Sequence, residues 1–272
     1  MKHNTSFSGI IAGTMGWGSW GKQLSENGMV GLMRHCIANG ITAFDHADIY
    51  GDYTTERDFG NAFAKSGIAR TDIQLISKCG IQYVGNTRNN SVKHYNYAKD
   101  YIIGSAETSL KQLKTDYLDL LLLHRPSPLM QPDEIAGAVT ALKKEGKIKA
   151  FGLSNFTPSQ TALIRSRIPV SANQIRFSVT HFDPMLDGSL DDMMLHDILP
   201  MAWSPLGDVF KETNPQTERI KLLLLELVEK YRATADQLLL AWVLKHPSGI
   251  RPVIGTTDKA RITHAAKASD VE

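Results

Sequence analysis

Short apolar runs alternate with amphipathic segments along the whole chain. Eight of these runs have the length and the flanking turn residues of buried β-strands: residues 8–16, 41–44, 73–78, 117–124, 150–154, 170–175, 199–204 and 251–254. The segments between them carry apolar residues at helical spacing, as Met29, Leu32, Met33 and Cys36 do within residues 25–39. Further helices are predicted over residues 55–65, 101–114, 132–144, 158–166, 190–196, 220–231, 235–246 and 258–268. Residues 85–97 show no periodicity and are predicted to form an extended loop.

The order of these elements selects one architecture among the α/β folds. Each predicted strand is followed by helical material, and no two strands are joined by a two-residue hairpin turn. That order is typical of a closed parallel barrel. The alternative is a doubly wound open sheet, but Gly13, Gly16 and Gly18 do not form the Gly-x-Gly-x-x-Gly turn that leads directly into a helix there. We therefore predict an α/β protein with a single (β/α)8 TIM barrel over residues 1–272.

Polar and titratable residues follow directly after several predicted strands. Asp45, Lys78 and His124 each stand at such an end, and Tyr50 comes in the loop after Asp45. Because the carboxyl ends of barrel strands share one face, these side chains are expected to lie together. An acid beside a cation that lowers its pKa, with a neutral imidazole to orient a carbonyl, suits proton transfer near neutral pH. Other strand ends carry Asn155, Gln174, Ser204 and Gly255.

Charge and composition argue against several other classes of function. The formal net charge is +2 and no run of Lys or Arg stands out, so a dedicated nucleic-acid surface is not expected. No apolar run approaches the ~20 residues of a membrane span. Cys36 and Cys79 are too few for a disulfide framework and fit a reducing cytoplasm. The polar residues 1–6 lack the apolar core of a signal peptide, and no metal site is predicted.

The segments that contain these strand ends resemble those of the aldo-keto reductase superfamily. In chain order they are Phe44-Asp45-His46-Ala47-Asp48-Ile49-Tyr50-Gly51, Ile76-Ser77-Lys78-Cys79-Gly80, Asp116-Tyr117-Leu118-Asp119-Leu120-Leu121-Leu122-Leu123-His124-Arg125-Pro126, Gly152-Leu153-Ser154-Asn155-Phe156 and Trp203-Ser204-Pro205-Leu206-Gly207. The resemblance covers nearly the whole chain. It is greatest to the bacterial oxidoreductase branch, which lacks the long C-terminal substrate loop of the mammalian reductases.

The resemblance implies an NADP-dependent reductase that converts an aldehyde or ketone to the alcohol. Tyr50 would be the general acid that protonates the carbonyl oxygen as the nicotinamide hydride reaches the carbon. Lys78 would lower the pKa of Tyr50, and Asp45 would hold Lys78 charged and in place. His124 would orient the carbonyl and stabilise the developing oxyanion.

The resemblance also implies which residues hold the nicotinamide half of NADP(H). Ser154, Asn155 and Gln174 match positions that hydrogen-bond the carboxamide, and Trp203 matches the aromatic residue on which the ring stacks. Asp45 and three residues at the end of the first strand, Gly13, Thr14 and Met15, complete this set.

The remaining cofactor positions lie in two later loops. Ser204, Pro205, Leu206 and Gly207 match the segment around the pyrophosphate. Ile254, Gly255, Thr256 and Arg261 match the adenosine-phosphate segment. Thr256 and Arg261 would hold the 2′-phosphate, and Arg261 falls in the first turn of the last helix, whose backbone N–H groups favour an anion. His264 and Ala265 replace the acidic residue and asparagine that many members place on the adenine.

Two other classes of function stay open from the sequence. A cofactor-binding sensor or regulatory subunit would turn over poorly, and a Schiff-base lyase would use Lys78 as its nucleophile. The substrate is expected to be a small carbonyl compound. Aromatic loop residues that should border its pocket favour an apolar or aromatic one: Trp17, Trp20, Tyr53 and Tyr83. The expected assembly is a monomer or a weak homo-oligomer.

Overall fold

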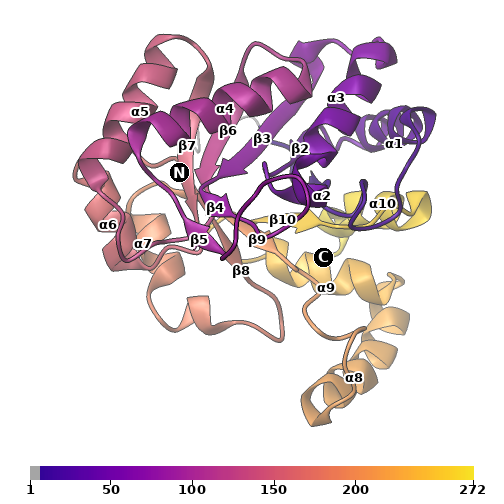
Figure 1. Cartoon of the computed structure of the whole chain (residues 1–272). Coiled ribbons are helices and arrows are strands. Elements are labelled where there is room, and N and C mark those ends of the chain that lie inside the picture. Colours follow the sequence, from indigo (N-terminus) through magenta and orange to yellow (C-terminus); the bar gives the residue numbers. More distant parts are fainter. Residues whose placement is uncertain (1–6) are drawn as a thin grey trace.

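The computed structural model describes residues 7–272 and shows a closed barrel of eight parallel strands (Figure 1). Around the ring the order is β1, β2, β3, β6, β7, β8, β9 and β10, and β10 pairs back onto β1. The strands are β1 Ile11–Gly13, β2 Ala43–Asp45, β3 Gln74–Cys79, β6 Leu118–Leu123, β7 Ile148–Ser154, β8 Ala172–Arg176, β9 Leu199–Trp203 and β10 Arg251–Ile254. The predicted (β/α)8 barrel is confirmed. Residues 1–6, to which the signal-peptide expectation referred, lie outside the described residues.

Helices surround the ring of strands (Figure 1). Their starts follow from local capping: Ser25 accepts a hydrogen bond from the Gly28 amide, and Thr157 and Gln160 form a reciprocal capping box. The helices are α1 Glu26–Ala38, α2 Tyr50–Tyr53, α3 Thr55–Ser66, α4 Lys99–Leu113, α5 Pro132–Lys144, α6 Pro158–Arg165, α7 Ser189–Leu195, α8 Pro215–Tyr231, α9 Ala235–Leu244 and α10 Lys259–Ala266.

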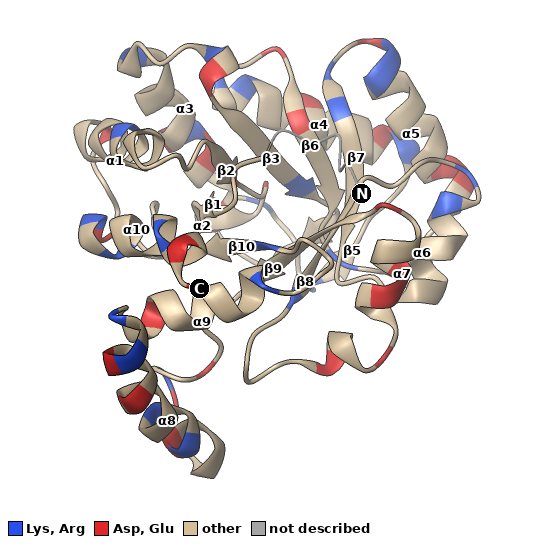
Figure 2. Ribbon diagram, turned by 180° about the vertical axis from the view of Figure 1, so that it is seen from behind, with Lys and Arg blue, Asp and Glu red and all other residues tan. Residues whose placement is uncertain are grey.

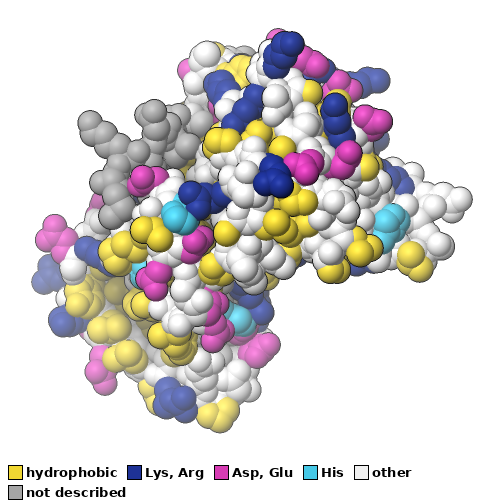
Figure 3. Space-filling view, turned by 90° about the vertical axis from the view of Figure 1, so that its left-hand side faces the viewer, with side chains coloured by type: hydrophobic (Ala, Val, Ile, Leu, Met, Phe, Trp, Pro, Cys, Tyr) yellow, Lys and Arg dark blue, Asp and Glu magenta, His cyan; other side chains and the backbone are white. Residues whose placement is uncertain are grey.

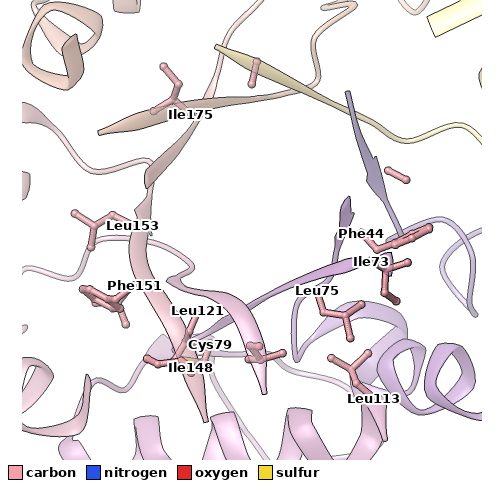
Figure 4. Packing of buried hydrophobic residues seen from close by; sticks show 14 of the residues in the cluster. Phe44, Ile73, Leu75, Cys79, Leu113, Leu121, Ile148, Phe151, Leu153 and Ile175 are labelled. Carbon is pink, nitrogen blue, oxygen red and sulfur yellow. The ribbon is translucent and has the colours of Figure 1, made fainter. Parts of the chain in front are cut away.

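The apolar core has two layers, one inside the ring of strands and one outside it. Along β6, Leu120 and Leu122 belong to the inner cluster, whereas Leu121 and Leu123 belong to the outer one. This alternation follows from the two-residue period of a strand. Figure 4 shows labelled members of the outer cluster, such as Leu153, lying on the outer side of the ring. A fully buried Leu or Phe contributes roughly 1.5–3 kcal/mol, so the two layers together fix the strand ends on which the polar residues stand.

Three features differ from the sequence-based predictions. His94–Tyr95 (β5) pairs antiparallel with Ile81–Gln82 (β4), so the predicted loop over residues 85–97 is wrong at those two residues. Two-residue strands are too short to show a period. Helix α8 begins at Pro215 rather than at residue 220, because Asn214 and Thr217 form a capping box there. Tyr50 starts the one-turn segment α2 instead of standing in a loop.

Helix α8 extends away from the barrel, and charged residues of both signs lie along it (Figures 1 and 2). Only Thr217 and Leu224 are buried, while Leu222, Leu223 and Leu225 are exposed. Elsewhere, the face in Figure 3 carries hydrophobic side chains in groups that charged and polar residues interrupt. Among residues 7–272, no helix combines the length and the apolar character needed to cross a membrane.

Candidate functional site

The carboxyl ends of β2 and β3 place Lys78 at the centre of a buried hydrogen-bond cluster. Its Nζ donates to Asp45 Oδ2 at 2.7 Å, to the His46 carbonyl oxygen at 2.8 Å and to Tyr50 Oη at 3.1 Å. Lys78 and Asp45 are 1% and 2% exposed. Three acceptors use all three N–H donors of an ammonium, so the geometry fixes Lys78 in its charged form.

Strand register explains why these side chains meet. Asp45, the last residue of β2, pairs with Ile76 in β3. Strand β3 therefore extends beyond the end of β2, and Lys78 lies beside the segment that follows β2. Ser77 faces the other side of β3, where it donates to Glu56. The second oxygen of Asp45 accepts a hydrogen bond from Gln174 Nε2 at 3.0 Å. Asp45 is therefore held from β3 and from β8.

His124 completes the set of four at the end of β6. Its ring lies edge-on to Tyr50, with the ring centroids 6.0 Å apart. Its Nδ1 is buried and has no hydrogen-bond partner among the described residues. The structure thus brings together all four residues proposed as catalytic from the sequence.

Burial and nearby charges set the pKa values of the cluster. Burial holds the pKa of His124 well below its ordinary value, and Lys78, Arg125 and Lys93 lower it further, so the imidazole is neutral near pH 7. Burial lowers the pKa of Lys78, but Asp45 and Tyr50 more than compensate, so the net pKa is raised.

The pKa of Tyr50 corrects the sequence-based expectation. Lys78 lowers it as expected, but burial raises it more, so the net pKa lies above its ordinary value. Desolvation of the phenol outweighs the effect of the nearby ammonium. Tyr50 is consequently a protonated phenol at neutral pH.

A left-handed turn positions Tyr50. Gly51, Asp52 and Tyr53 follow it with φ angles of 61°, 55° and 65°. Such angles are unfavourable for Asp and Tyr, so tertiary contacts must hold them. Asp52 Oδ2 accepts hydrogen bonds from the amides of Asn86 and Thr87, at 2.7 and 3.1 Å. The loop after β4 is thereby fastened to the turn that carries Tyr50.

The residues predicted to hold nicotinamide gather at the ends of β7, β8 and β9. Ser154 Oγ donates to the Gln174 carbonyl and accepts from Asn155 Nδ2. Asn155 Oδ1 in turn accepts from Trp203 Nε1 at 2.8 Å. These bonds link Ser154, Asn155 and Trp203 into one network. One N–H of Gln174 Nε2 is bonded to Asp45, which leaves its second N–H and its amide oxygen for a carboxamide.

The end of β1 gives a mixed result for the predicted cofactor contacts. Gly13 stands opposite Asp45 in the sheet, and a Cβ there would lie 3.1 Å from the Ile254 carbonyl oxygen. Thr14 is fully buried and donates to the Asp45 carbonyl, so its hydroxyl contacts the protein instead of an open site. Met15 is 52% exposed.

The segment after β9 forms a tight turn. Ser204 and Gly207 have positive φ angles, and the Gly207 amide donates to the Ser204 carbonyl at 2.9 Å. Pro205 is buried, and Leu206 packs against the apolar core. The backbone conformation of this segment is thus defined by the protein itself.

The loop after β10 leaves side chains exposed. Ile254 is buried, Gly255 is exposed, and Thr256 Oγ1 accepts from the Asp258 amide. Arg261 lies in the first turn of α10, as predicted, and is exposed. Its backbone N–H, however, donates to the capping carboxylate of Asp258 at 3.0 Å. The N–H of Arg261 is therefore already satisfied within the cap, and the exposed guanidinium is the group of Arg261 that can meet an anion.

The aromatic residues expected around the substrate pocket separate into two groups. Trp17 and Tyr53 are 1% and 5% exposed, and Trp17 packs against Phe44 in the core, so Trp17 is not a pocket residue. Trp20 is 39% exposed and contacts the rings of Tyr50 and Tyr83. Trp20 thus lies beside both Tyr50 and Tyr83. A Trp in a glycine-rich loop gives no sign from sequence of which way it faces.

Two buried carboxyl groups behind the cluster were not singled out from the sequence. Glu56 accepts from Ser77 Oγ at 2.5 Å, and Asp48 accepts from Ser105 Oγ at 2.9 Å. Neither has an ion-pair partner among the described residues. Burial raises the pKa of each to about 7. Asp48 lies within the segment from Phe44 to Gly51. Only the fold shows that its carboxyl group bonds Ser105 on α4 and not Lys78.

Glu56 should make stability depend on pH. Its folded-state pKa of about 7 lies above its ordinary 4.5, so the folded protein holds this proton more tightly than the unfolded chain. The contribution of Glu56 to stability is therefore greatest below about pH 4.5 and is lost as pH rises towards 7, by up to about 3 kcal/mol. We expect Glu56→Gln to reduce the difference in unfolding free energy between about pH 5 and about pH 8, measured by urea denaturation.

The matched control is Glu229→Gln, at an exposed position on α8. It should leave the pH dependence of unfolding unchanged. An equal pH dependence in wild type and Glu56→Gln would show that Glu56 is ionised without cost in the folded protein.

No group of three or more His, Cys, Asp or Glu residues suited to a metal ion occurs within residues 7–272.

Comparison with known proteins places this geometry in a family. A model described as Aldo/keto reductase family matches residues 9–272. Uncharacterized oxidoreductase YcsN of Bacillus subtilis is 41% identical, over 98% of this chain and 91% of that protein. Oxidoreductase YdhF of Escherichia coli is 39% identical, over 98% and 89%. A 6-dehydroglucose reductase of Agrobacterium fabrum is 38% identical, over 86% and 79%.

Solved structures share the fold. The thermostable aldo-keto reductase Tm1743, in complex with the inhibitor epalrestat, superposes with a TM-score of 0.79 at 28% identity, covering 97% of this chain and 90% of that one. An aldo-keto reductase of Klebsiella pneumoniae in complex with NADPH gives a TM-score of 0.78 at 24% identity, covering 97% and 86%. From the barrel, the strand-end cluster and these matches together, we conclude that the chain belongs to the aldo/keto reductase family.

Proposed function

We propose that this protein is an NADPH-dependent oxidoreductase that reduces an aldehyde or ketone to the alcohol. The observation that carries the proposal is the buried cluster in which Lys78 bonds both Asp45 and Tyr50, with His124 facing Tyr50. An ordinary structural ion pair would not hold the phenol of Tyr50 beside a neutral imidazole. We further propose that residues 1–272 form one cytoplasmic domain, which acts as a monomer or a weak homo-oligomer.

Each residue has a defined part in the proposed reaction. His124, kept neutral by its lowered pKa, would donate a hydrogen bond to the substrate carbonyl oxygen. Tyr50 would pass its phenolic proton to that oxygen as negative charge develops on it. The Lys78 ammonium, 3.1 Å away, would stabilise the tyrosinate that remains, and Asp45 would keep Lys78 charged.

The residues of this chain fit a nicotinamide cofactor. Trp203 is only partly buried, and its indole orientation is fixed by Asn155, as a stacking platform requires. Arg261 is exposed and has no ion pair among residues 7–272, so it can hold a phosphate. When bound, NADPH would supply the hydride. The NADPH complex of the Klebsiella protein supports this choice by similarity of fold.

The two alternative functions receive less support. A Schiff-base lyase needs a free amine, but the Lys78 ammonium donates all three of its protons to acceptors. A sensor with little turnover would not need a protonated phenol and a neutral imidazole facing one another. We keep the sensor as the alternative that an activity measurement must exclude.

The test is multiple turnover with a panel of carbonyl compounds at fixed NADPH, followed by the loss of NADPH absorbance. We expect sustained oxidation of NADPH with at least one aldehyde and formation of the alcohol in equal amount. A single turnover followed by arrest, while NADPH still binds, would instead identify a sensor.

Arg261 should decide between NADPH and NADH. Losing one charge-assisted hydrogen bond to the 2′-phosphate costs roughly 1.5–3 kcal/mol, or about one to two decades in affinity. Arg261→Ala is therefore expected to weaken NADPH binding by that factor in a fluorescence titration, with the weaker binding of NADH nearly unchanged.

Lys267→Ala, which removes an exposed cation from the opposite end of α10, is the control for general electrostatics. It should change the affinity for neither cofactor. Equal weakening of NADPH and NADH in Arg261→Ala, or a wild-type preference for NADH, would remove Arg261 from the phosphate site.

A further inference from the structure

Arg125 follows His124 directly and has a fixed backbone. The hydroxyl of the buried Tyr97 donates to the Arg125 carbonyl oxygen and accepts from the Arg125 amide. Tyr97 itself is packed over Gly80, where a Cβ would lie only 1.9 Å from the tyrosine ring. The backbone of Arg125 is therefore held in place directly after the end of β6.

The guanidinium of Arg125 has no anion to neutralise it. It lies 5.3 Å from the centre of the Trp203 ring and is partly buried. Among residues 7–272 it forms no ion pair, and no hydrogen bond joins it to another residue. Arg176, whose guanidinium lies 5.5 Å from the same ring, is instead paired with Asp208. A partly buried charge is ordinarily paired, and among residues 7–272 Arg125 has no such partner.

The charges around the proposed carbonyl site are positive. Lys78, Arg125 and Lys93 all lower the pKa of His124. Asp45 neutralises Lys78, whereas Arg125 and Lys93 have no ion pair among the described residues. A guanidinium presents paired N–H donors that match a carboxylate or a phosphate. An anionic group on the substrate could therefore form an ion pair and paired hydrogen bonds with the Arg125 guanidinium.

We propose that Arg125 binds an anionic group of the substrate, so that this protein acts on carbonyl compounds that carry a carboxylate or a phosphate a few bonds from the reacting carbon. The proposal rests on the proposed function, because His124 and Tyr50 must hold the carbonyl for Arg125 to meet the acid. It adds an anionic group to the apolar or aromatic carbonyl compound expected from the loop aromatic residues.

Matched substrate pairs test the proposal. Succinic semialdehyde and para-carboxybenzaldehyde are each compared with their methyl esters, which keep the aldehyde and lose the charge. In wild type we expect a higher kcat/KM for the acid in at least one pair. Arg125→Gln should lower the acid-to-ester ratio of kcat/KM by about ten- to a hundredfold, mainly through KM. Arg125→Lys should retain part of the ratio, and Arg219→Gln, on exposed α8, should leave it unchanged.

Binding without turnover keeps this test independent of the proposed reaction. Benzoate and the neutral benzamide are titrated into the enzyme with NADPH, followed by tryptophan fluorescence. Arg125→Gln should weaken benzoate at least tenfold and benzamide far less. The proposal is overturned if the acid-to-ester ratio and benzoate affinity are unchanged, or if the variant weakens NADPH by the same factor, which would assign Arg125 to the cofactor. Absence of turnover with every aldehyde, with charge-selective benzoate binding intact, would contradict only the proposed reaction.

Discussion

Tyr50→Phe is expected to lower kcat by at least about 10²-fold, the usual loss when a general acid is removed. The substitution deletes one oxygen that accepts a hydrogen bond from Lys78 and leaves the ring beside Trp20 and His124. The fold and the cofactor contacts should therefore be preserved. Steady-state reduction of an aldehyde by NADPH measures the loss, and a fluorescence titration should show nearly unchanged NADPH affinity.

Tyr231→Phe is the matched control, because it removes the same atom from the exposed end of α8. Its kcat should equal that of wild type. If Tyr50→Phe kept most of its activity, another group would have to supply the proton. The Lys78 ammonium, His124 and water admitted into the space that the Tyr50 hydroxyl leaves are the further donors near this position, and a solvent-dependent rate would identify water among them.

Lys78→Met and Asp45→Asn should each abolish most activity and also destabilise the fold. Their side chains form a buried ion pair at 2.7 Å, and removing one partner leaves the other charge in the interior without compensation. That loss costs about 3–5 kcal/mol. Gln174 still bonds Asp45 in Lys78→Met, but a neutral amide cannot replace the ammonium. Both kcat and the unfolding free energy are measured.

The double variant distinguishes a coupled pair from two separate residues. It leaves no uncompensated charge, so its loss of stability and of kcat should be much smaller than the sum of the single losses in free energy. The exposed pair Lys221 and Glu218 on α8 provides the control, where the coupling should remain below about 1 kcal/mol. Additive losses at Lys78 and Asp45 would mean that the two residues act independently.

The sequence predicts the barrel well because its strands and helices carry strong periodic patterns. Runs such as Leu118–Leu123 are long enough to identify a buried strand, and parallel order places every strand end on one face. The meeting of Asp45, Lys78 and His124 follows from that topology. Two-residue strands such as β4 and β5 have no detectable period.

Other features depend on three-dimensional contacts that no local pattern encodes. The bond from Gln174 to Asp45 joins residues 129 positions apart. The burial of Glu56 against Ser77 and the burial of Trp17 depend on how α3 packs against the barrel. The start of α8, by contrast, could have been found: Asn214 before Pro215, with Thr217 three residues after the cap, is a recognisable N-terminal signal.

The left-handed turn after Tyr50 has a consequence for the order of folding. Gly51, Asp52 and Tyr53 are held in this conformation partly by Ser19 and by the amides of residues 86 and 87, which bond to the turn. These groups belong to loops more than thirty residues away in the sequence. Bringing these loops to the turn is slow compared with the formation of local helices. During refolding, the helical circular dichroism signal should therefore recover before enzymatic activity, because the barrel can close while the Tyr50 hydroxyl is still misplaced.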